Sequence, residues 1–571
     1  MEPSVYHIYQ DYIWEQKNED LAKYLYNLPV LEMGGLHTRV PDILAKYKKS
    51  PWFSQERVKE IQRVLVEINR EMNCLTPKVH SSIMNLHDGA VESAHQTIVM
   101  GGPGYILNKA ASAVSISEYC TQNGITVTPY FCIADYDVVQ SELTNIRTPN
   151  IGQNGNLISI PVPEGYEYSP VNHLPLPDYE WYREAEESIK SSYRPLFKVL
   201  DGTARILLDE RLEHALTVTR KAFVNSKTLG EWATRILGSL FNIEGNLGIP
   251  LVPAGDKRIR RALLSGLEYL LSQDKRSAFL RAHENATQMI GAEGYATGAG
   301  SRGKDYVPFL YECPNRDCNN SRTELVYRDQ GSNAILEGKC PSCGEKIQIE
   351  VEKGEPDLEE HAEQLSLRVD SRQLAIDTII PTIAHVGGPG ETAYYAQVIP
   401  AAKEMDEPFP AFIRYPRTYF NTPWNEELGK ELKKKDIPVL HDRDLFKLSG
   451  RINKFRRKEN DQKMNDAVQE FSQYLHSVHS QLNDAYEEII KEIEETSGGK
   501  YEELQMLKLD IEKYLSWTFG QYAPDKLSQE SAWSWIEWSL NSGFTDLFGP
   551  YQRAHSQGLK NGATLFINFM V

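Results

Sequence analysis

The sequence has few cysteines, no long hydrophobic run and no excess of basic residues, and each absence excludes a class of protein. Seven cysteines among 571 residues are too few for a disulfide framework, which fits a reducing compartment. No stretch approaches the roughly 18 consecutive apolar residues of a membrane-spanning helix. The first residues, Met-Glu-Pro-Ser, lack the basic and then apolar pattern of a secretory signal. We therefore expect a cytoplasmic protein that makes no membrane contact.

The chain is acidic, with a net charge of −17 at pH 7. This charge argues against a nucleic-acid grip over a globally basic surface, although a local basic patch is compatible with it. Nucleic acid is therefore a disfavoured partner, and a tRNA-binding enzyme is the least expected function. The length and the 41% of hydrophobic residues predict several domains with a large core.

Two glycine turns with the same sequence organise the chain. Gly387-Gly388-Pro389-Gly390 follows an apolar run at 378–386, and helical spacing follows it at 391–403. Upstream, a strand-like segment precedes Gly101-Gly102-Pro103-Gly104, and a helical pattern follows at 105–120. Such a turn lets the backbone approach a ligand and points helix N–H groups at it. Two copies predict two halves of one α/β nucleotide-type site, split by a long insertion; the alternative is that each is only a turn.

Polar side chains accompany the first turn. His95 and Gln96 stand at the end of a strand predicted at 90–94, where ligands of open α/β sheets bind. They would contact a phosphate or a leaving oxygen, or His95 would merely bond a loop carbonyl. Lys109, in the following helix, would reach a phosphate or simply solvate the helix.

Two carboxylates follow the next predicted strand, at 125–134. Asp135 and Asp137 are two residues apart, so in a continuing strand they point to one face. Such a pair would bind a substrate ammonium or a magnesium ion. Alternatively, the two residues cap the next helix.

Four arginines bracket the second turn. The guanidinium group suits carboxylates and phosphates because its planar fork donates two parallel hydrogen bonds. We expect one or two of the four to reach the ligand and the others to lie on the surface. They are Arg368, Arg372, Arg414 and Arg417.

The four remaining chemistry-bearing residues are cysteines in two pairs. Cys313 and Cys318 form the first pair, and Cys340 and Cys343 form the second, with Gly344 allowing a tight bend. This spacing predicts a zinc ribbon with a tetrahedral four-cysteine site; the alternative is four free thiols close in sequence. Because all four ligands are protein thiolates, the Zn²⁺ would be structural. The ribbon could also contact nucleic acid or a partner protein.

A heptad pattern runs along the C-terminal part, from Val468 to Ile489, and a second helical segment follows the pair Gly498-Gly499. The pattern predicts a helical hairpin or coiled coil that packs or dimerises. The expected division of the chain is 1–85 N-terminal helical segment, 86–177 first half of the core, 178–304 helical connecting insertion, 305–355 zinc ribbon, 356–445 second half of the core, and 446–571 coiled-coil region.

These motifs resemble the bacillithiol-biosynthesis cysteine-adding enzymes, the BshC family, in the same order and over most of the chain. The resemblance rests on Ala94-His95-Gln96 with Gly101-Gly102-Pro103 and Lys109, on 131–137, on Leu367-Arg368 to Pro381-Thr382, on 385–397, and on Pro416-Arg417. Two departures stand out. If the two aspartates are matched to those of the family, Tyr136 stands at the family's histidine and Ala134 at its preceding glutamate. If Phe131 is matched without a gap, Val138 stands at the histidine instead. The ribbon falls where a shorter loop is expected.

The resemblance implies an α/β fold: a Rossmann-like core similar to class I aminoacyl-tRNA synthetases, with a helical insertion and a coiled coil that forms a homodimer. The zinc ribbon predicted from the cysteine spacing is an addition to this fold. It implies a ligase that joins cysteine to an aminosugar-malate conjugate, with ATP or another nucleotide as a cofactor implied by the fold. The catalytic candidates are His95, Gln96, Asp135 and Asp137. The candidates for substrate or nucleotide binding are Gly101, Gly102, Lys109, Arg368, Gly387, Gly388, Gly390, Glu391 and Arg417.

Two functions of different classes follow. The first is an amide-forming ligase that positions the carboxylate of an amino acid, in the first instance cysteine, for an amine. The second is a family member without this chemistry that binds partners through the ribbon and the coiled coil, which the loss of the family histidine favours. Thermal-shift screening with ATP, cysteine and aminosugar-malate separates them, because a ligand of the native state raises its midpoint.

Overall fold

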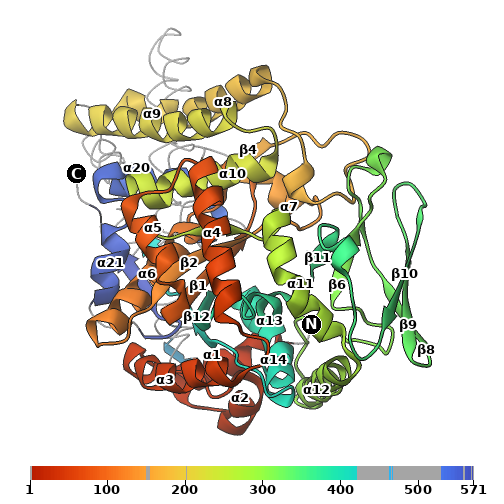
Figure 1. The fold of residues 1–571 in the computed structure, drawn as a ribbon. Helices are drawn as coiled ribbons and strands as arrows, with labels where there is room; N and C mark the ends of the chain where they lie inside the picture. Colours follow the sequence, from red (N-terminus) through yellow and green to blue (C-terminus); the bar gives the residue numbers. More distant parts are fainter. Residues whose placement is uncertain are drawn as a thin grey trace.

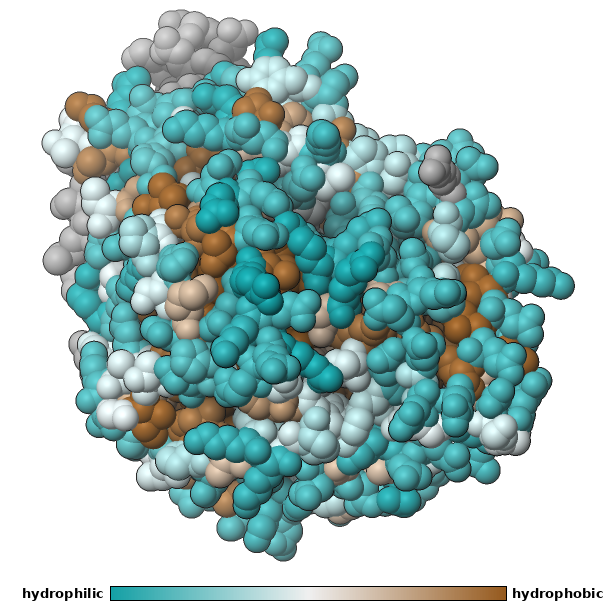
Figure 2. Space-filling model, in the orientation of Figure 1, coloured by the Kyte–Doolittle hydropathy of each residue, from teal (hydrophilic) through white to brown (hydrophobic). Residues whose placement is uncertain are grey.

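The computed structural model describes residues 3–149, 155–200, 202–420, 462–463, 466, 529–556, 560–567 and 569. The predicted heptad and the helix after it lie outside these residues. Among the described helices, none is both long and hydrophobic enough to cross a membrane. The face in Figure 2 is mostly hydrophilic, with hydrophobic residues in small separate groups.

The core is a five-stranded parallel sheet in the order β13-β12-β1-β2-β5. Its strands are β1 (Ala90–Gln96), β2 (Thr128–Ala134), β5 (Leu251–Pro253), β12 (Thr382–Gly387) and β13 (Ala411–Arg414). The chain runs from β1 outward to β2 and β5, then returns to β12 beside β1 and continues to β13. Strand order therefore reverses between β1 and β12, which is where open α/β sheets bind ligands.

The strands predicted at 90–94, 125–134 and 378–386 are confirmed as β1, β2 and β12, although β2 and β12 begin later than the patterns suggested. In sequence, the segment 247–253 indicates only a short buried crossing within the helical insertion. Its last residues, Leu251–Pro253, instead pair with β2 as the edge strand β5. A strand of three residues has too few positions to show an alternating pattern, and the helical insertion therefore contributes to the sheet itself.

Helices cover both faces of the sheet because alternate strand residues are apolar on both sides (Figure 1). Val91 and Phe131 pack in one core cluster with α6, while Ala90 and Tyr130 pack in the other with α4, α5 and α11. The two crossover helices are α6 (Tyr105–Gln122), after the first glycine turn, and α14 (Pro389–Glu404), after the second. Both confirm the helices predicted to follow these turns.

The N-terminal segment is helical, as its periodicity predicted. Its α4 begins after Ser54, whose side chain accepts a hydrogen bond from the Glu56 N–H and so caps the helix. The helices are α1 (Tyr6–Glu15), α2 (Glu19–Tyr26), α3 (Met33–Lys49), α4 (Gln55–Glu71) and α5 (Pro77–Met84).

The long insertion is helical in its first part and stranded in its second. In Figure 1, α8 and α9 lie along the top of the molecule and the β8–β10 sheet lies at its right edge. The helices are α8 (Tyr179–Val199), α9 (Gly202–Val224), α10 (Leu229–Gly238), α11 (Lys257–Leu271) and α12 (Gln273–Ala292). The strands are β6 (Phe309–Glu312), β7 (Arg322–Thr323), β8 (Val326–Gln330), β9 (Asn333–Lys339), β10 (Lys346–Glu352) and β11 (Leu365–Leu367).

The C-terminal residues pack against the first glycine turn, a role that no sequence motif indicated. The indole N–H of Trp535 donates to the Met100 carbonyl at 2.7 Å, and the Gly104 N–H donates to the Trp533 carbonyl at 2.9 Å. The elements here are α19 (Gln529–Ala532), α20 (Trp535–Ser542), α21 (Gly549–Ser556) and β15 (Thr564–Ile567), which pairs with β14 (Arg417–Phe420). The smaller elements near the site are α7 (Ser141–Thr144), α13 (Arg372–Ile376), and the paired strands β3 (Asn145–Thr148) and β4 (Asn156–Ser159).

Candidate functional site

A cavity of about 900 Å³ opens at the carboxyl ends of β1 and β12, where the strand order reverses. His95 and Gln96 at the end of β1 line it, as do Gly388 and Gly390 at the start of α14. The two glycine-turn units, nearly 300 residues apart in sequence, therefore meet at one cavity. This is the location that the strand order predicts for a ligand.

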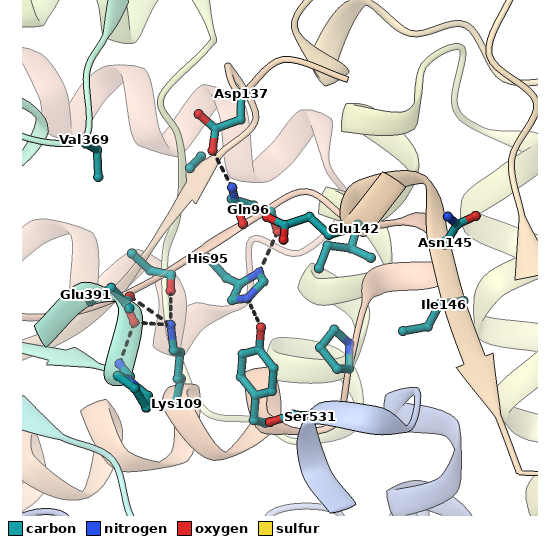
Figure 3. A pocket seen from close by; sticks show the side chains of 18 of the residues that line it. His95, Gln96, Lys109, Asp137, Glu142, Asn145, Ile146, Val369, Glu391 and Ser531 are labelled. Carbon is teal, nitrogen blue, oxygen red and sulfur yellow. Dashed lines mark hydrogen bonds and ion pairs between the residues drawn. The ribbon is translucent and has the colours of Figure 1, made fainter. Parts of the chain in front are cut away.

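A chain of buried charged groups joins the two units beneath the cavity. The Arg372 guanidinium donates to Glu92, and Glu92 Oε2 accepts from His385 Nδ1 at 2.8 Å. The other ring nitrogen of His385 lies 3.7 Å from Glu391 Oε1. Lys109 Nζ donates to both Glu391 oxygens, at 2.8 and 2.9 Å, and to the Ala94 carbonyl at 2.9 Å. Figure 3 shows Lys109 and Glu391 facing each other across the floor of the cavity.

The neighbouring cations keep both carboxylates of this chain ionised. Burial alone would raise the pKa of Glu92, but the charge of Arg372, together with the interaction with His385, outweighs it and lowers the pKa to about 2. Burial likewise opposes ionisation of Glu391, yet Lys109 and His385 hold its pKa well below the usual range. Breaking one partner would leave a buried charge uncompensated, which is why such pairs are costly to disrupt.

His95 is a neutral imidazole in this site. Burial, with a smaller contribution from the Lys109 charge, lowers its pKa to about 4. Nδ1 lies 2.9 Å from the Gln96 carbonyl oxygen, which can only accept, so Nδ1 carries the proton. Nε2 therefore accepts the hydrogen bond from the Tyr105 hydroxyl. His95 thus reaches the cavity through a phenol rather than as a free cation.

Gln96 and Asp137 form a second polar group on the cavity wall. Gln96 Nε2 donates to Asp137 Oδ2 at 2.6 Å, and both residues line the cavity (Figure 3). Tyr136 also lines it, and its side chain is buried. Asp137 keeps 27% of its side chain exposed, so its carboxylate remains accessible to a ligand.

Asp135 does not share this wall, contrary to the expectation that both aspartates face one side. Asp135 Oδ1 accepts the Gly255 N–H at 2.6 Å, and its side chain is absent from the cavity lining. The chain leaves β2 in a turn directly after Ala134, so the alternation of a strand no longer applies. Burial raises the pKa of this carboxyl to about 7.

Five other sequence-predicted residues also lie off the cavity lining. Gly101 and Gly102 sit against Ile236 and Ile106, and Gly387 sits against Phe412. The Arg368 guanidinium donates to Glu324 Oε1 at 3.0 and 3.1 Å, and Arg417 belongs to β14, beside β15. Predicted residues that do line the cavity are His95, Gln96, Lys109, Asp137, Arg372, Gly388, Gly390 and Glu391.

Sequence reasoning gave no individual role to Glu92, His385, Tyr105 or Tyr415. The signal for the first two was available, because a glutamate and a histidine inside apolar strands must be paired when buried. Glu92 and His385 are in fact direct neighbours in the register of β1 and β12. Tyr105 and Tyr415 gave no comparable signal, because they belong to different halves of the core. Their stacked rings, with centres 6.0 Å apart, are neighbours only in the folded structure.

The α14 N-terminus is already neutralised by its own side chain. Glu391 Oε2 accepts the Gly388 N–H, so a carboxylate occupies the position where a helix would bind an external anion. A phosphate at this turn would meet that negative charge. The residues of the second turn therefore do not fit a nucleotide phosphate.

The four cysteines of the insertion form a compact cluster away from the cavity. Their sulfur atoms all lie within 4.8 Å of one another, and Cys313 and Cys343 are 3.7 Å apart. Tetrahedral metal–sulfur bonds of about 2.3 Å would place the sulfurs about 3.8 Å apart. The cluster thus has the dimensions to hold one metal ion with four thiolate ligands. Three of the cysteines are buried and Cys343 is exposed.

Comparison with known proteins gives a consistent result. A family model described as "Bacillithiol biosynthesis BshC, N-terminal Rossmann-like domain" matches residues 3–418. A protein of Natranaerobius thermophilus is 23% identical over 60% of this chain and 56% of its own length. A protein of Chloroherpeton thalassium is 22% identical over 66% and 60%, and one of Christiangramia forsetii is 21% identical over 88% and 85%. Each of the three is named "Putative cysteine ligase BshC".

Proposed function

This chain belongs to the BshC family of bacillithiol biosynthesis, and from that premise we propose that it is a cysteine ligase. The bond formed would be an amide between the carboxyl group of cysteine and an aminosugar-type amine. The matched segments cover little more than half of the first two relatives, so the activity is inferred from the family and the site together.

One observation carries the proposal: the cavity combines a carboxylate on one wall with cations in its floor. An amino acid presents an ammonium group and a carboxylate, and these need opposite partners. Asp137, with Gln96 beside it, offers an acceptor for the ammonium. Lys109 and Arg372, each paired with a glutamate in the floor, line the same cavity and would be the partners of the ligand carboxylate there. Opposite charges at two ends of a cavity favour one orientation of such a ligand.

The roles of the remaining candidates follow from their hydrogen bonds. Tyr105 donates its single phenol proton to neutral His95, so it would offer only an acceptor oxygen to the ligand. Glu391 would hold Lys109 in place, and Gly388 and Gly390 would form the cavity wall nearest α14. Asp135, Gly101, Gly102, Gly387, Arg368 and Arg417 are proposed only as supporting residues. No nucleotide phosphate is assigned to the second turn.

Calorimetric titration with cysteine tests the binding step. Asp137→Asn should weaken cysteine binding by about 1–3 kcal/mol, because it removes the charge of an ammonium partner. Asp135→Asn is the matched control, since its carboxylate faces the Gly255 N–H rather than the cavity. A wild-type protein that binds neither cysteine nor aminosugar-malate, or an Asp135 variant weaker than the Asp137 variant, would refute the proposal.

We also propose that the cysteine cluster holds one structural Zn²⁺. Purified protein should contain about one zinc per chain, tetrahedrally bound by sulfur at about 2.3 Å. Cys340→Ser should release the metal and loosen the strands around it while the parallel sheet stays folded. Metal analysis that finds no zinc in carefully prepared protein would end this proposal.

A homodimer through the heptad at 468–489 is proposed from the sequence alone, since that segment lies outside the described residues. Leu475→Asp would place a charge in the seam and should weaken association. Light scattering on the unmodified protein at micromolar concentration tests this. A monomer would mean that the apolar heptad positions pack within one chain and do not form a dimer.

A binding or scaffold role is the second candidate, and Tyr136 is the observation that favours it. If the aspartates are matched to those of the family, its histidine is replaced here by a phenol that is buried and lines the cavity, which removes one titratable group from the site. In that case the thermal midpoint should stay unchanged with cysteine, ATP and aminosugar-malate alike. Metabolite analysis of a strain that lacks the protein would then separate the two functions in the cell.

A further inference from the structure

Arg322 lies at the point where the cysteine-bearing insertion meets the cavity wall. It begins β7, four residues after Cys318, and pairs with Glu312 of β6. Its backbone N–H donates to the Tyr168 carbonyl at 2.8 Å. Main-chain contacts with β6 of the insertion and with Tyr168 of the first core half therefore fix this residue independently of the cavity.

The Arg322 side chain extends out of the insertion and contacts Asp137. The guanidinium donates to Asp137 Oδ1 at 3.4 Å and to the Leu367 carbonyl, and it lies 5.2 Å from the centre of the Tyr136 ring. Only 7% of the side chain is exposed. It does not line the cavity, whereas Asp137 and Tyr136 do.

Asp137 is thus held between two donors on opposite sides. Gln96 donates to one carboxylate oxygen at 2.6 Å and Arg322 to the other. A carboxylate that is partly exposed and bonded on one side only could rotate about its side-chain torsions. A second, charged donor removes this freedom, because the planar guanidinium is itself anchored by the Leu367 carbonyl.

We infer that Arg322 is a positioning residue, supplied to the cavity by the four-cysteine insertion, that orients the Asp137 carboxylate for an ammonium ligand. The inference rests on the proposed function for the identity of that ligand. It does not require Arg322 to touch the ligand, since its effect passes through Asp137.

The same contacts connect Arg322 to the cysteine cluster. Ser321, the preceding residue, donates its N–H to the Cys318 carbonyl and accepts the Cys313 N–H, both at 3.0 Å. Its hydroxyl also accepts from Ser342, between Cys340 and Cys343, at 2.9 Å. Residues from both cysteine pairs therefore hold Ser321 in place. A metal ion in the cluster would stiffen these contacts, and loss of the metal would free Arg322 together with them.

A double-mutant cycle measured by cysteine titration tests the side-chain role. Arg322→Gln and Asp137→Asn should each weaken binding by roughly tenfold, and the double variant should bind no more weakly than Asp137→Asn alone. Arg322→Lys keeps the charge without the planar fork, so it should recover part of the affinity and show that folding is intact. Arg328→Gln is the matched control, because this exposed arginine of the same insertion pairs with Glu337.

Hydrogen exchange separates this inference from the proposed function, because it needs no ligand. Arg322→Gln should speed amide exchange in residues 134–139. Cys340→Ser alone should also speed amide exchange in residues 134–139. In the Arg322→Gln variant, adding Cys340→Ser should cause no further increase in exchange. Unchanged exchange in Arg322→Gln, or fully additive losses of binding in the double variant, would overturn the inference. If the unmodified protein binds no cysteine, the proposed function fails while the exchange result still decides the role of Arg322.

Discussion

The two glycine turns have the same four residues but different structures. In the first, Gly101 and Gly102 adopt positive φ angles of 82° and 90°, and the turn is buried beneath Trp535. In the second, Gly388 has φ −103° and begins a capped helix that lines the cavity. Backbone conformation and packing hold the first turn, whereas buried charges hold the second. A shared motif therefore indicates a shared place in the fold, not a shared role.

The largest effect should come from removing the charge that holds the second turn. Glu391→Gln would leave the Lys109 ammonium, whose side chain is 4% exposed, without its counter-charge. Disrupting such a buried pair costs about 3–5 kcal/mol. Denaturant unfolding measures this cost. A loss below about 1 kcal/mol would mean that the pair does not organise the second turn.

The next effect should distinguish the turns by backbone conformation. Gly101→Ala would place a Cβ 2.6 Å from an Ile236 methyl carbon at a positive φ, costing about 2–4 kcal/mol through strain and overpacking. Gly388→Ala, at negative φ with its nearest neighbour 3.1 Å away on Tyr415, should cost less. Unfolding curves of the two variants provide the comparison. Equal losses of unfolding free energy in the two variants would contradict the view that backbone conformation holds only the first turn.

Much of the fold could be predicted from these motifs. The two strand–turn–helix units and the helical N-terminal segment have periodicities that depend on local sequence, and the structure contains them. The edge strand β5 could not be predicted, because three residues show no alternation. Both turns reach one cavity because of the strand order. This order depends on the return of β12 to pair with β1.

The site was less predictable because its geometry depends on contacts between distant segments. His95, Gln96, Lys109 and Glu391 were named from their positions at strand and helix ends. Asp135 was misplaced because the chain turns directly after β2. The pairing of Glu92 with Arg372 spans 280 residues, and no local pattern reveals such a partner.

The pH dependence should differ between the two turns. Behind the first turn, burial raises the pKa of Glu530 to about 7, despite hydrogen bonds from Thr418, Tyr551 and Asn108. Its contribution to stability is therefore complete below about pH 4.5 and is lost as pH rises through about 7. Among the buried charges that join β1 to the second turn, Glu92 has a pKa of about 2, so its contribution is complete above about pH 4.5 and is lost as pH falls toward 2.

Free energies of unfolding measured from pH 3 to 9 check these signs. Glu530→Gln should remove a loss of about 1–3 kcal/mol between pH 4.5 and 8, because the neutral amide does not ionise. It should leave the acid-side loss, to which Glu92 and Glu391 contribute, unchanged. If Glu530→Gln instead changed the loss of stability at acid pH, the titrating groups would have been assigned to the wrong turns.

The smallest effect on stability should come from the last glycine of each turn. An added Cβ at Gly390 meets no atom within 4 Å, and one at Gly104 first meets the Glu530 carbonyl oxygen at 3.7 Å. Neither residue requires a positive φ, so Gly104→Ala and Gly390→Ala should each change unfolding by no more than about 0.5 kcal/mol. Their ligand binding should differ, however. Gly390 lines the cavity and Gly104 does not, so only Gly390→Ala should alter cysteine affinity in calorimetric titration. Equal affinities for both variants would show that the ligand does not approach the second turn, and the functional difference between the turns would then be lost.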